Sequence, residues 1–254
     1  MTTVDETVAA LAEQQAELES LLVGLSAGQW HSATRCEGWD VADVVLHLAQ
    51  SDELAIASVT GRFDQLASQR SGAPVGGLSV DESAALMVER ERALPPAELF
   101  GRWTSTTAHL VELLDGMDLS TRVSWVAGTL SARTLATTRL AETWIHAGDI
   151  ADALGRELAA TDRLRLVARL AWRTLPYAFG SAGLTLGGPV AFRLTSPSGD
   201  AWEFLPDQPA VTIITGPAAD LCEVAARRRD PAATFLTGDG PDAADVLALV
   251  RTYA

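Results

Sequence analysis

The first half of the chain carries the repeating apolar pattern of amphipathic helices. Apolar residues recur at intervals of three and four up to Gly28, which predicts a first helix beginning at a capping box of Thr3 and Glu6. The pattern returns from about Val41 into the sixties, where Asp40 is placed to cap a second helix. The N-terminal region is therefore expected to be helical.

Three more helices are predicted on the same reasoning. We expect them over residues 79–93, 96–116 and 132–154, and Gly155 after the last one supplies the conformation that commonly ends a helix. Of these five predicted helices, the one over residues 132–154 is the fourth main helix, and four main helices with connectors of this kind predict a bundle in which the second and fourth main helices face each other.

From Thr161 onward the pattern changes to short strands mixed with helices. A helix is expected from Thr161 to Leu175, with Pro176 helping to end it. Two alternating segments around a Ser-Pro-Ser-Gly-Asp turn predict a hairpin, and a third short strand and two Pro-initiated helices follow; these lie at 190–194, 202–205, 211–214, 217–229 and 241 to the C-terminus.

This change of pattern divides the chain into two predicted domains. The fold class is α+β, with a helical domain over residues 1–157 and a small mixed α/β domain over residues 158–254. A length of 254 residues with 48% hydrophobic content is enough for two modest cores.

Composition removes several classes of function. The net charge is −14, so we expect no binding to nucleic acid or to anionic membrane surfaces. All 19 basic residues are Arg, and without Lys the chain has no Schiff-base or P-loop lysine chemistry. Cys36 and Cys222 form no Cys-x-x-Cys motif. The acidic N-terminus is unlike a secretory signal, and the expected location is the cytoplasm.

A pair of ligand-type residues lies on the last helix of the predicted bundle. Glu142 and His146 are four residues apart, so on a helix they lie one turn apart on the same face. A zinc-type ion accepts such groups at about 2 Å, and a rigid helix presents two of them without strain. The same spacing also occurs as an ordinary solvated pair, so a third ligand is needed to favour a metal site.

His47 is the candidate for that third ligand. It lies on the flank of the apolar stripe of Val41, Val44, Val45 and Leu48. A histidine in this position is either a metal ligand or a packed residue at the edge of the core, and the pattern alone leaves both interpretations open.

Two blocks of sequence resemble a known family. Trp30, the run Cys36-Glu37-Gly38-Trp39-Asp40-Val41 followed by His47, and the block from Glu142 to Asp149 resemble the mycothiol-dependent maleylpyruvate isomerase family. That family belongs to the DinB-like metal-binding helical bundles. The resemblance implies a DinB-like four-helix bundle and a sterol-carrier-like C-terminal domain. It further implies one divalent metal held by His47, Glu142 and His146.

The resemblance also implies a type of chemistry. It points to an enzyme that uses zinc and mycothiol, a low-molecular-weight thiol, against an electrophilic small molecule. Three protein ligands leave a fourth position open, and a thiol bound to zinc is deprotonated. Isomerisation and S-transfer both remain open. The alternatives are a related enzyme recruited to a biosynthetic pathway and a non-catalytic module that binds a metal and an apolar ligand.

Five other residues have two interpretations each. Arg228 is either part of a basic helix end or, by resemblance, a catalytic and cofactor-binding residue, with Arg227 as the competing match. Asp43 and Asp149 are expected to be solvated acids, although either is placed to support a neighbouring histidine. Cys36 is expected to be a small buried hydrophobe or a reactive thiol. His109 is expected to be structural or exposed.

Overall fold

The structure is a computed structural model, and it describes residues 5–71, 79–126 and 128–252. The chain forms two compact units, Met1–Leu158 and Ala159–Ala254. The first unit is mainly helical and the second combines helices with a four-stranded sheet, so the predicted α+β class is confirmed.

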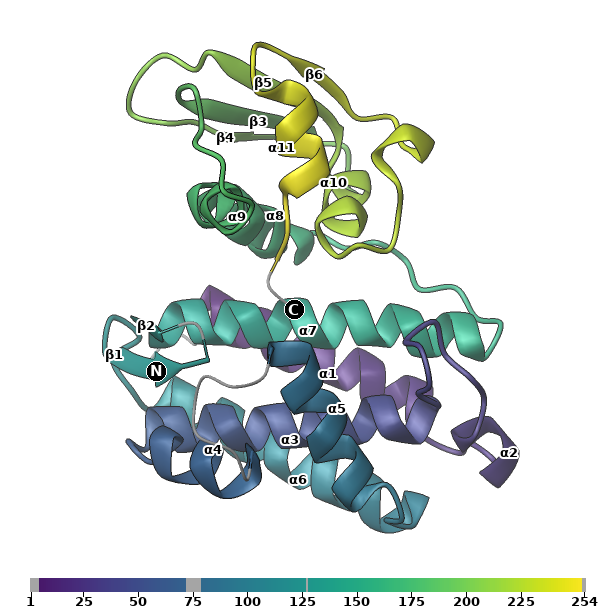
Figure 1. The fold of residues 1–254 in the computed structure, drawn as a ribbon. Helices are drawn as coiled ribbons and strands as arrows, with labels where there is room; N and C mark the ends of the chain where they lie inside the picture. Colours follow the sequence, from purple (N-terminus) through teal and green to yellow (C-terminus); the bar gives the residue numbers. More distant parts are fainter. Residues whose placement is uncertain (1–4, 72–78, 127, 253–254) are drawn as a thin grey trace. The chain divides into compact units, whose positions relative to one another are not determined.

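Four long helices build the first unit (Figure 1). They are α1 (Glu6–Leu22), α3 (Val41–Val59), α6 (Pro96–Asp115) and α7 (Ala132–Ala153). Helix α3 packs against α6 and α7, and α1 packs against the same two helices. The predicted facing of the second and fourth main helices is therefore confirmed for α3 and α7.

Shorter elements connect these four helices. They are α2 (Ala27–Trp30), α4 (Phe63–Ser71), α5 (Val80–Glu91) and an antiparallel hairpin of β1 (Arg122–Trp125) and β2 (Gly128–Ser131). The hairpin is not predicted by the sequence pattern, because strands of four residues are too short to show a clear alternation.

The ends of the helices show which capping predictions were right. Asp40 caps α3 in a capping box with Asp43, and Gly155 follows α7 with a φ of 63°. The first helix differs from the prediction, because Asp5 caps α1 and the helix ends at Leu22 rather than near Gly28. The predicted cap at Thr3 lies outside the described residues.

The core of the first unit lies where the apolar faces of the long helices meet. Leu18 of α1, Val44 and Leu48 of α3, Trp103 of α6 and Ile150 of α7 belong to one buried cluster. Side chains of this size contribute about 1.5–3 kcal/mol each when fully buried, so this cluster fixes the relative positions of α3 and α7.

The second unit is a mixed sheet with four helices. The strands β3 (Val190–Thr195), β4 (Ala201–Phe204), β5 (Thr212–Pro217) and β6 (Thr237–Asp239) have the order β4-β3-β5-β6. The β3–β5 pair is parallel, and the β3–β4 and β5–β6 pairs are antiparallel. The predicted hairpin is thus confirmed as β3 and β4. The helices are α8 (Leu164–Arg173), α9 (Leu175–Ser181), α10 (Ala218–Ala225) and α11 (Ala243–Leu249).

The role of Pro176 at a helix boundary of this unit was predicted wrongly. Helix α8 ends at Arg173, and Pro176 lies in the first turn of the next helix, α9. Proline fits this position because the first backbone N–H groups of a helix have no partner within the helix. The residue expected to help end a helix therefore helps to begin one.

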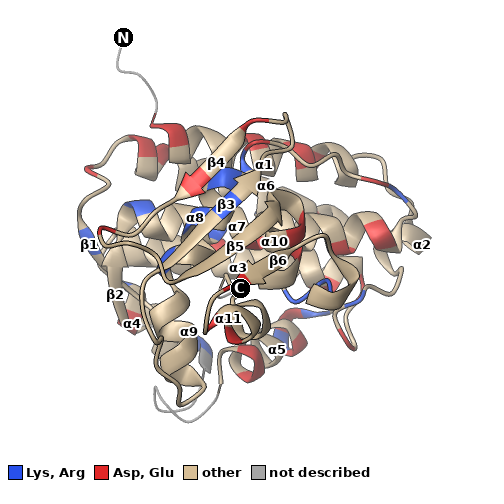
Figure 2. Ribbon diagram, turned by 90° about the horizontal axis from the view of Figure 1, so that it is seen from above, with Lys and Arg blue, Asp and Glu red and all other residues tan. Residues whose placement is uncertain are grey.

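The acidic residues are spread over the helices and loops rather than collected at one place (Figure 2). This distribution matches a chain with 33 acidic and 19 basic residues. In the part of the chain that the structure describes, no helix is both long and apolar enough to cross a membrane.

Candidate metal centre

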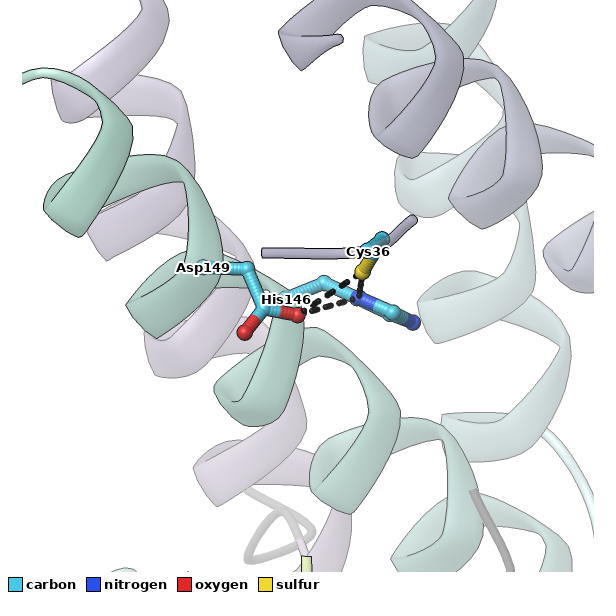
Figure 3. A group of neighbouring side chains, drawn as sticks. All are labelled: Cys36, His146 and Asp149. Atoms are coloured by element: carbon cyan, nitrogen blue, oxygen red, sulfur yellow. Dashed lines mark hydrogen bonds and ion pairs between the residues drawn. The ribbon is translucent and has the colours of Figure 1, made fainter. Parts of the chain in front are cut away.

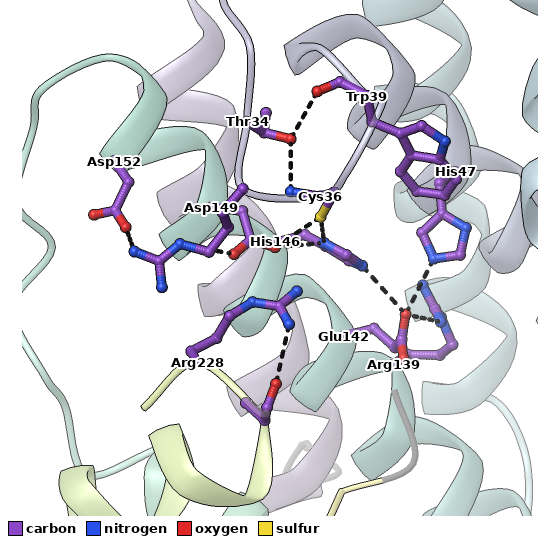
Figure 4. A network of polar contacts seen from close by, with 12 residues as sticks. Thr34, Cys36, Trp39, His47, Arg139, Glu142, His146, Asp149, Asp152 and Arg228 are labelled. Carbon is purple, nitrogen blue, oxygen red and sulfur yellow. Dashed lines mark hydrogen bonds and ion pairs between the residues drawn. The ribbon is translucent and has the colours of Figure 1, made fainter. Parts of the chain in front are cut away.

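His47, Glu142 and His146 point toward one another from α3 and α7 (Figure 4). The His47 Nε2 atom lies 3.3 Å from Glu142 Oε2, and the His146 Nε2 atom lies 3.8 Å from the same oxygen. The side chains are 9–12% exposed. Two nitrogens and one carboxylate oxygen thus meet at one buried point between facing helices.

The spacing of these three atoms suits a tetrahedral metal ion. Ligand atoms about 2.0–2.1 Å from zinc in tetrahedral geometry lie about 3.3–3.4 Å from one another. The observed separations of 3.3 and 3.8 Å are close to this value, and all three atoms lie within 4.8 Å of one another. A donor set of two imidazoles and a carboxylate also binds zinc in preference to magnesium or calcium.

The other ring nitrogen of His146 has its own partners. His146 Nδ1 lies 3.0 Å from Asp149 Oδ2, and the Cys36 thiol donates to the same oxygen at 3.3 Å (Figure 3). Asp149 is buried, so the expectation of a solvated acid was wrong. A carboxylate at this position accepts a hydrogen bond from a proton on Nδ1, so Nε2 is the ring nitrogen that faces Glu142.

Asp43 is buried as well, but for a different reason. It completes the capping box of α3 and forms an ion pair with Arg92, whose Nε lies 2.9 Å from Asp43 Oδ1. The expectation of a solvated acid was wrong here too. Asp43 stabilises the first turn of the helix that carries His47.

His47 is held in a different way from His146. Its ring lies against the Trp39 ring, with centroids 5.2 Å apart, and 5.1 Å from the His146 ring. Its Nδ1 atom is buried and has no hydrogen-bond partner among the described residues. Packing against Trp39 therefore sets the orientation of the His47 ring.

The remaining two histidines lie in solvent. His31 is 65% exposed and pairs with Asp40, and His109 is 53% exposed, with Nδ1 3.8 Å from Glu112. The expectation for His109 is confirmed. Of the four histidines in the chain, the two predicted as ligands are thus the two withdrawn from water.

The three grouped side chains have strongly perturbed pKa values. Burial alone would raise the pKa of Glu142, but the hydrogen bond with His47 and the charge of Arg139 lower it to about 2. Burial lowers the pKa of His47, and the contact with Glu142 offsets this only in part. Burial also opposes the charge on His146, yet Asp149, Cys36 and Glu142 raise its pKa to about 9. The site without a metal therefore holds an anionic Glu142 and a cationic His146 at neutral pH.

A buried ion pair that the sequence pattern does not predict lies beside this group. Arg139 Nε donates to Asp52 Oδ1 at 2.7 Å, with the two side chains 2% and 1% exposed. Arg139 Nη1 also lies 3.9 Å from Glu142 Oε2. The one available signal was spacing, because Arg139 precedes Glu142 by three residues and so shares its helix face.

The arginines at the end of α10 belong to the second unit. Arg228 Nη1 donates to the Ala226 carbonyl at 3.1 Å. Arg227 has a φ of 59° and donates to the carbonyls of Ala248 and Leu249, so its guanidinium supports the end of α11. Asp220 forms an ion pair with Arg229, with Nη1 and Oδ1 2.8 Å apart. The assignment of Arg228 as a site residue stays a prediction.

The chain is similar to a family model and to two curated proteins. Residues 11–151 match the family model described as the mycothiol maleylpyruvate isomerase N-terminal domain. Two proteins of Mycobacterium tuberculosis, uncharacterized protein MT0041 from strain CDC 1551 and uncharacterized protein Rv0036c from strain H37Rv, are each 36% identical over 225 residues. The match covers 87% of this chain and 85% of each relative.

Solved structures give the same result for the fold. The crystal structure of the mycothiol-dependent maleylpyruvate isomerase has a TM-score of 0.61 at 19% identity and covers 93% of both chains. A histidine-to-alanine mutant of that enzyme has a TM-score of 0.60 at 19% identity and covers 90% of both chains. These matches confirm the resemblance seen in the sequence, and the chain belongs to the mycothiol maleylpyruvate isomerase N-terminal domain family.

Proposed function

We propose that the chain is a metal-dependent enzyme that uses mycothiol, acting as an isomerase or an S-transferase on an electrophilic small molecule. The observation that carries this proposal is the convergence of His47, Glu142 and His146, with ligand-type atoms 3.3 and 3.8 Å apart. The name of the solved relatives supports the thiol, since they are described as mycothiol-dependent maleylpyruvate isomerase.

The proposed ligands would hold one divalent ion, with zinc as the preferred metal. Such an ion would supply Lewis acidity that favours the thiolate form of a thiol at its open position. Glu142 contributes the single negative charge of this donor set, since both histidines bind metals in their neutral form. His146 must lose the proton that it carries in the metal-free site.

The neighbouring residues fix these groups in place. Asp149 holds the proton on Nδ1 of His146, and Trp39 packs against His47. The Arg139 guanidinium, anchored by Asp52, lies near Glu142 and keeps that carboxylate ionised. We propose that Arg228 of the second unit binds a carboxylate or enolate of the reacting molecule through paired hydrogen bonds.

A single substitution separates two roles for Glu142. Glu142→Gln keeps size and shape but replaces an anionic oxygen donor by a neutral one. If Glu142 is a ligand, zinc affinity falls. If it is instead a general base, zinc occupancy stays at the level of the parent protein while turnover falls by about 10²-fold or more.

The measurement is made in a Cys36→Ser protein, because the Cys36 thiol lies 3.9 Å from His146 and would react with reagents that follow thiol consumption. Zinc content is measured after dialysis. Mycothiol-dependent loss of maleylpyruvate or another electrophile reports turnover, and net consumption of mycothiol distinguishes S-transfer from isomerisation, which regenerates the thiol. Glu112→Gln on the exposed face of α6 is the matched control. Full zinc occupancy with unaltered affinity in the Glu142→Gln protein would refute the ligand role. Zinc retention with no thiol-dependent turnover would favour a non-catalytic binding module.

A further inference from the structure

A second group of potential metal ligands shares His146 with the first. Cys36, His146 and Asp149 each offer one ligand atom, and these atoms all lie within 4.8 Å of one another (Figure 3). The sulfur lies 3.3 Å from Asp149 Oδ2 and 3.9 Å from His146 Nδ1, and that nitrogen lies 3.0 Å from the same oxygen. The group faces Nδ1 of the ring, whereas His47 and Glu142 face Nε2.

These separations fit a tetrahedral thiophilic ion. With a zinc–sulfur distance of about 2.3 Å and zinc–nitrogen or zinc–oxygen distances of about 2.0–2.1 Å, the sulfur lies about 3.5 Å from the other donors, which lie about 3.3 Å apart. Each observed separation is within a few tenths of an ångström of these values. A small adjustment of side chains would therefore complete the coordination.

The segment that carries Cys36 is ordered by its own hydrogen bonds. Thr34 Oγ1 donates to the Trp39 carbonyl at 2.9 Å and accepts from the Cys36 N–H at 3.2 Å (Figure 4). The Trp39 N–H donates to the Cys36 carbonyl at 3.0 Å. The thiol is therefore held beside His146 by a closed turn.

Charge also favours a divalent ion at this second group. Glu142 is the one anionic donor in the first group, so a divalent ion there leaves a net charge of +1. A thiolate and the Asp149 carboxylate together cancel a divalent charge, and thiolate is the softer donor. Arg35 lies 3.7 Å from the other Asp149 oxygen, Oδ1, so Oδ2 remains directed at Cys36 and His146.

We propose that Cys36, His146 and Asp149 form a second metal site for thiophilic divalent ions, which competes with the first site for the single imidazole of His146. A neutral imidazole has one ring proton and one free lone pair, so an ion at Nδ1 places the proton on Nε2, and an ion at Nε2 places it on Nδ1. Binding at the second site releases two protons to the solvent, one from the Cys36 thiol and one from the doubly protonated ring of His146. The chain thus binds one ion at a time.

Cobalt(II) distinguishes the two sites by spectroscopy, since cobalt–thiolate coordination gives an intense charge-transfer band in the near ultraviolet and nitrogen–oxygen coordination does not. In the His47→Ala protein we expect one Co²⁺ per chain with this band. In the Cys36→Ser protein we expect one Co²⁺ without it. In the double variant, Co²⁺ affinity should fall by at least about tenfold relative to either single variant, which corresponds to about 1.4 kcal/mol.

Cys222 provides the matched control, because it is buried in the second unit beside the Leu164 carbonyl. A Cys222→Ser substitution in the His47→Ala protein should leave the band unchanged. Absence of the band from the His47→Ala protein would overturn the proposal, as would its survival when Cys36 is also replaced. Two ions per chain in the unsubstituted protein would overturn the competition. None of these readouts depends on turnover, so the proposal and the proposed enzymatic function fail separately.

Discussion

Removal of the buried carboxylate of Asp52 should strongly destabilise the helical unit. Its carboxylate and the Arg139 guanidinium meet at 2.7 Å with almost no exposure, and they join α3 to α7. Burial raises the pKa of Asp52 even though Arg139 opposes the shift, so the environment is one in which an uncompensated charge is costly. Asp52→Ala would leave the guanidinium buried without its principal anion.

The expected loss follows from the geometry of the pair. Removing one partner of a buried ion pair costs about 3–5 kcal/mol, because the other charge stays desolvated. Arg139 cannot escape by deprotonation, and its Nη2 atom has no hydrogen-bond partner among the described residues even with Asp52 in place. Replacing both residues, as in Asp52→Leu with Arg139→Met, should cost much less than Asp52→Ala alone, because neither charge is then buried.

Urea unfolding followed by tryptophan fluorescence measures these differences, since five of the seven tryptophans lie in the first unit. Glu203→Ala is the control: its partner Arg193 lies 3.3 Å away and both side chains are more than half exposed, so we expect a change of less than about 1 kcal/mol. A loss of under about 1 kcal/mol for Asp52→Ala, or a double variant less stable than the single one, would refute the reasoning.

Three further predictions concern His146. His146→Ala should abolish zinc retention, because the ring is common to both ligand groups. Circular dichroism should still show a helical protein, and the control variant His109→Ala should keep its zinc. Zinc retained by the His146→Ala protein would exclude His146 as a ligand. Because the pKa of His146 is raised to about 9, zinc affinity should increase at least about tenfold per pH unit as pH rises towards 9, measured by chelator competition. The metal-free protein should show the opposite trend: the stability contributed by charged His146 is complete below about pH 6.5 and is lost as pH rises through 9, which urea unfolding at several pH values would detect. A flat pH profile in both experiments would contradict this assignment.

The grouping of His47, Glu142 and His146 was predicted from two sources, the regular helices and the family resemblance, which singled out His47 where the pattern alone left its role open. Helical periodicity placed Glu142 and His146 on one face, and four long helices placed the second opposite the fourth. What periodicity could not supply was burial. Asp149 was expected in solvent because acids usually lie there, but α7 is covered on that face by the segment that carries Cys36.

Two other differences have local causes. The hairpin of β1 and β2 has four-residue strands, which leave too few positions to reveal a period of two. Pro176 has the same restricted φ whether a helix ends before it or begins around it, so the residue alone does not distinguish the two cases. The neighbouring chain decides: the C-cap at Thr174 ends α8, and the apolar residues of α9 continue beyond it.

The polar residues on the buried face of α7 follow one rule that relates the fold to the site. Arg139, Glu142, His146 and Asp149 are spaced by three, four and three residues, which is the spacing of an apolar stripe. A helix that buries polar groups at these positions needs a partner for each. From the start of α7 to its end, these partners are Asp52 for Arg139, His47 for Glu142 and Cys36 for Asp149, so the residue numbers of the partners fall as those of α7 rise. This order is that of two antiparallel segments, so the packing that builds the core also brings each polar group to its partner. Along this face of α7, the buried ion pair at Arg139 comes first, the proposed metal ligands Glu142 and His146 follow, and the contact of Asp149 with the Cys36 thiol comes last. A shift of α7 by one turn along its axis would therefore separate all of its polar residues from Asp52, His47 and Cys36 at once.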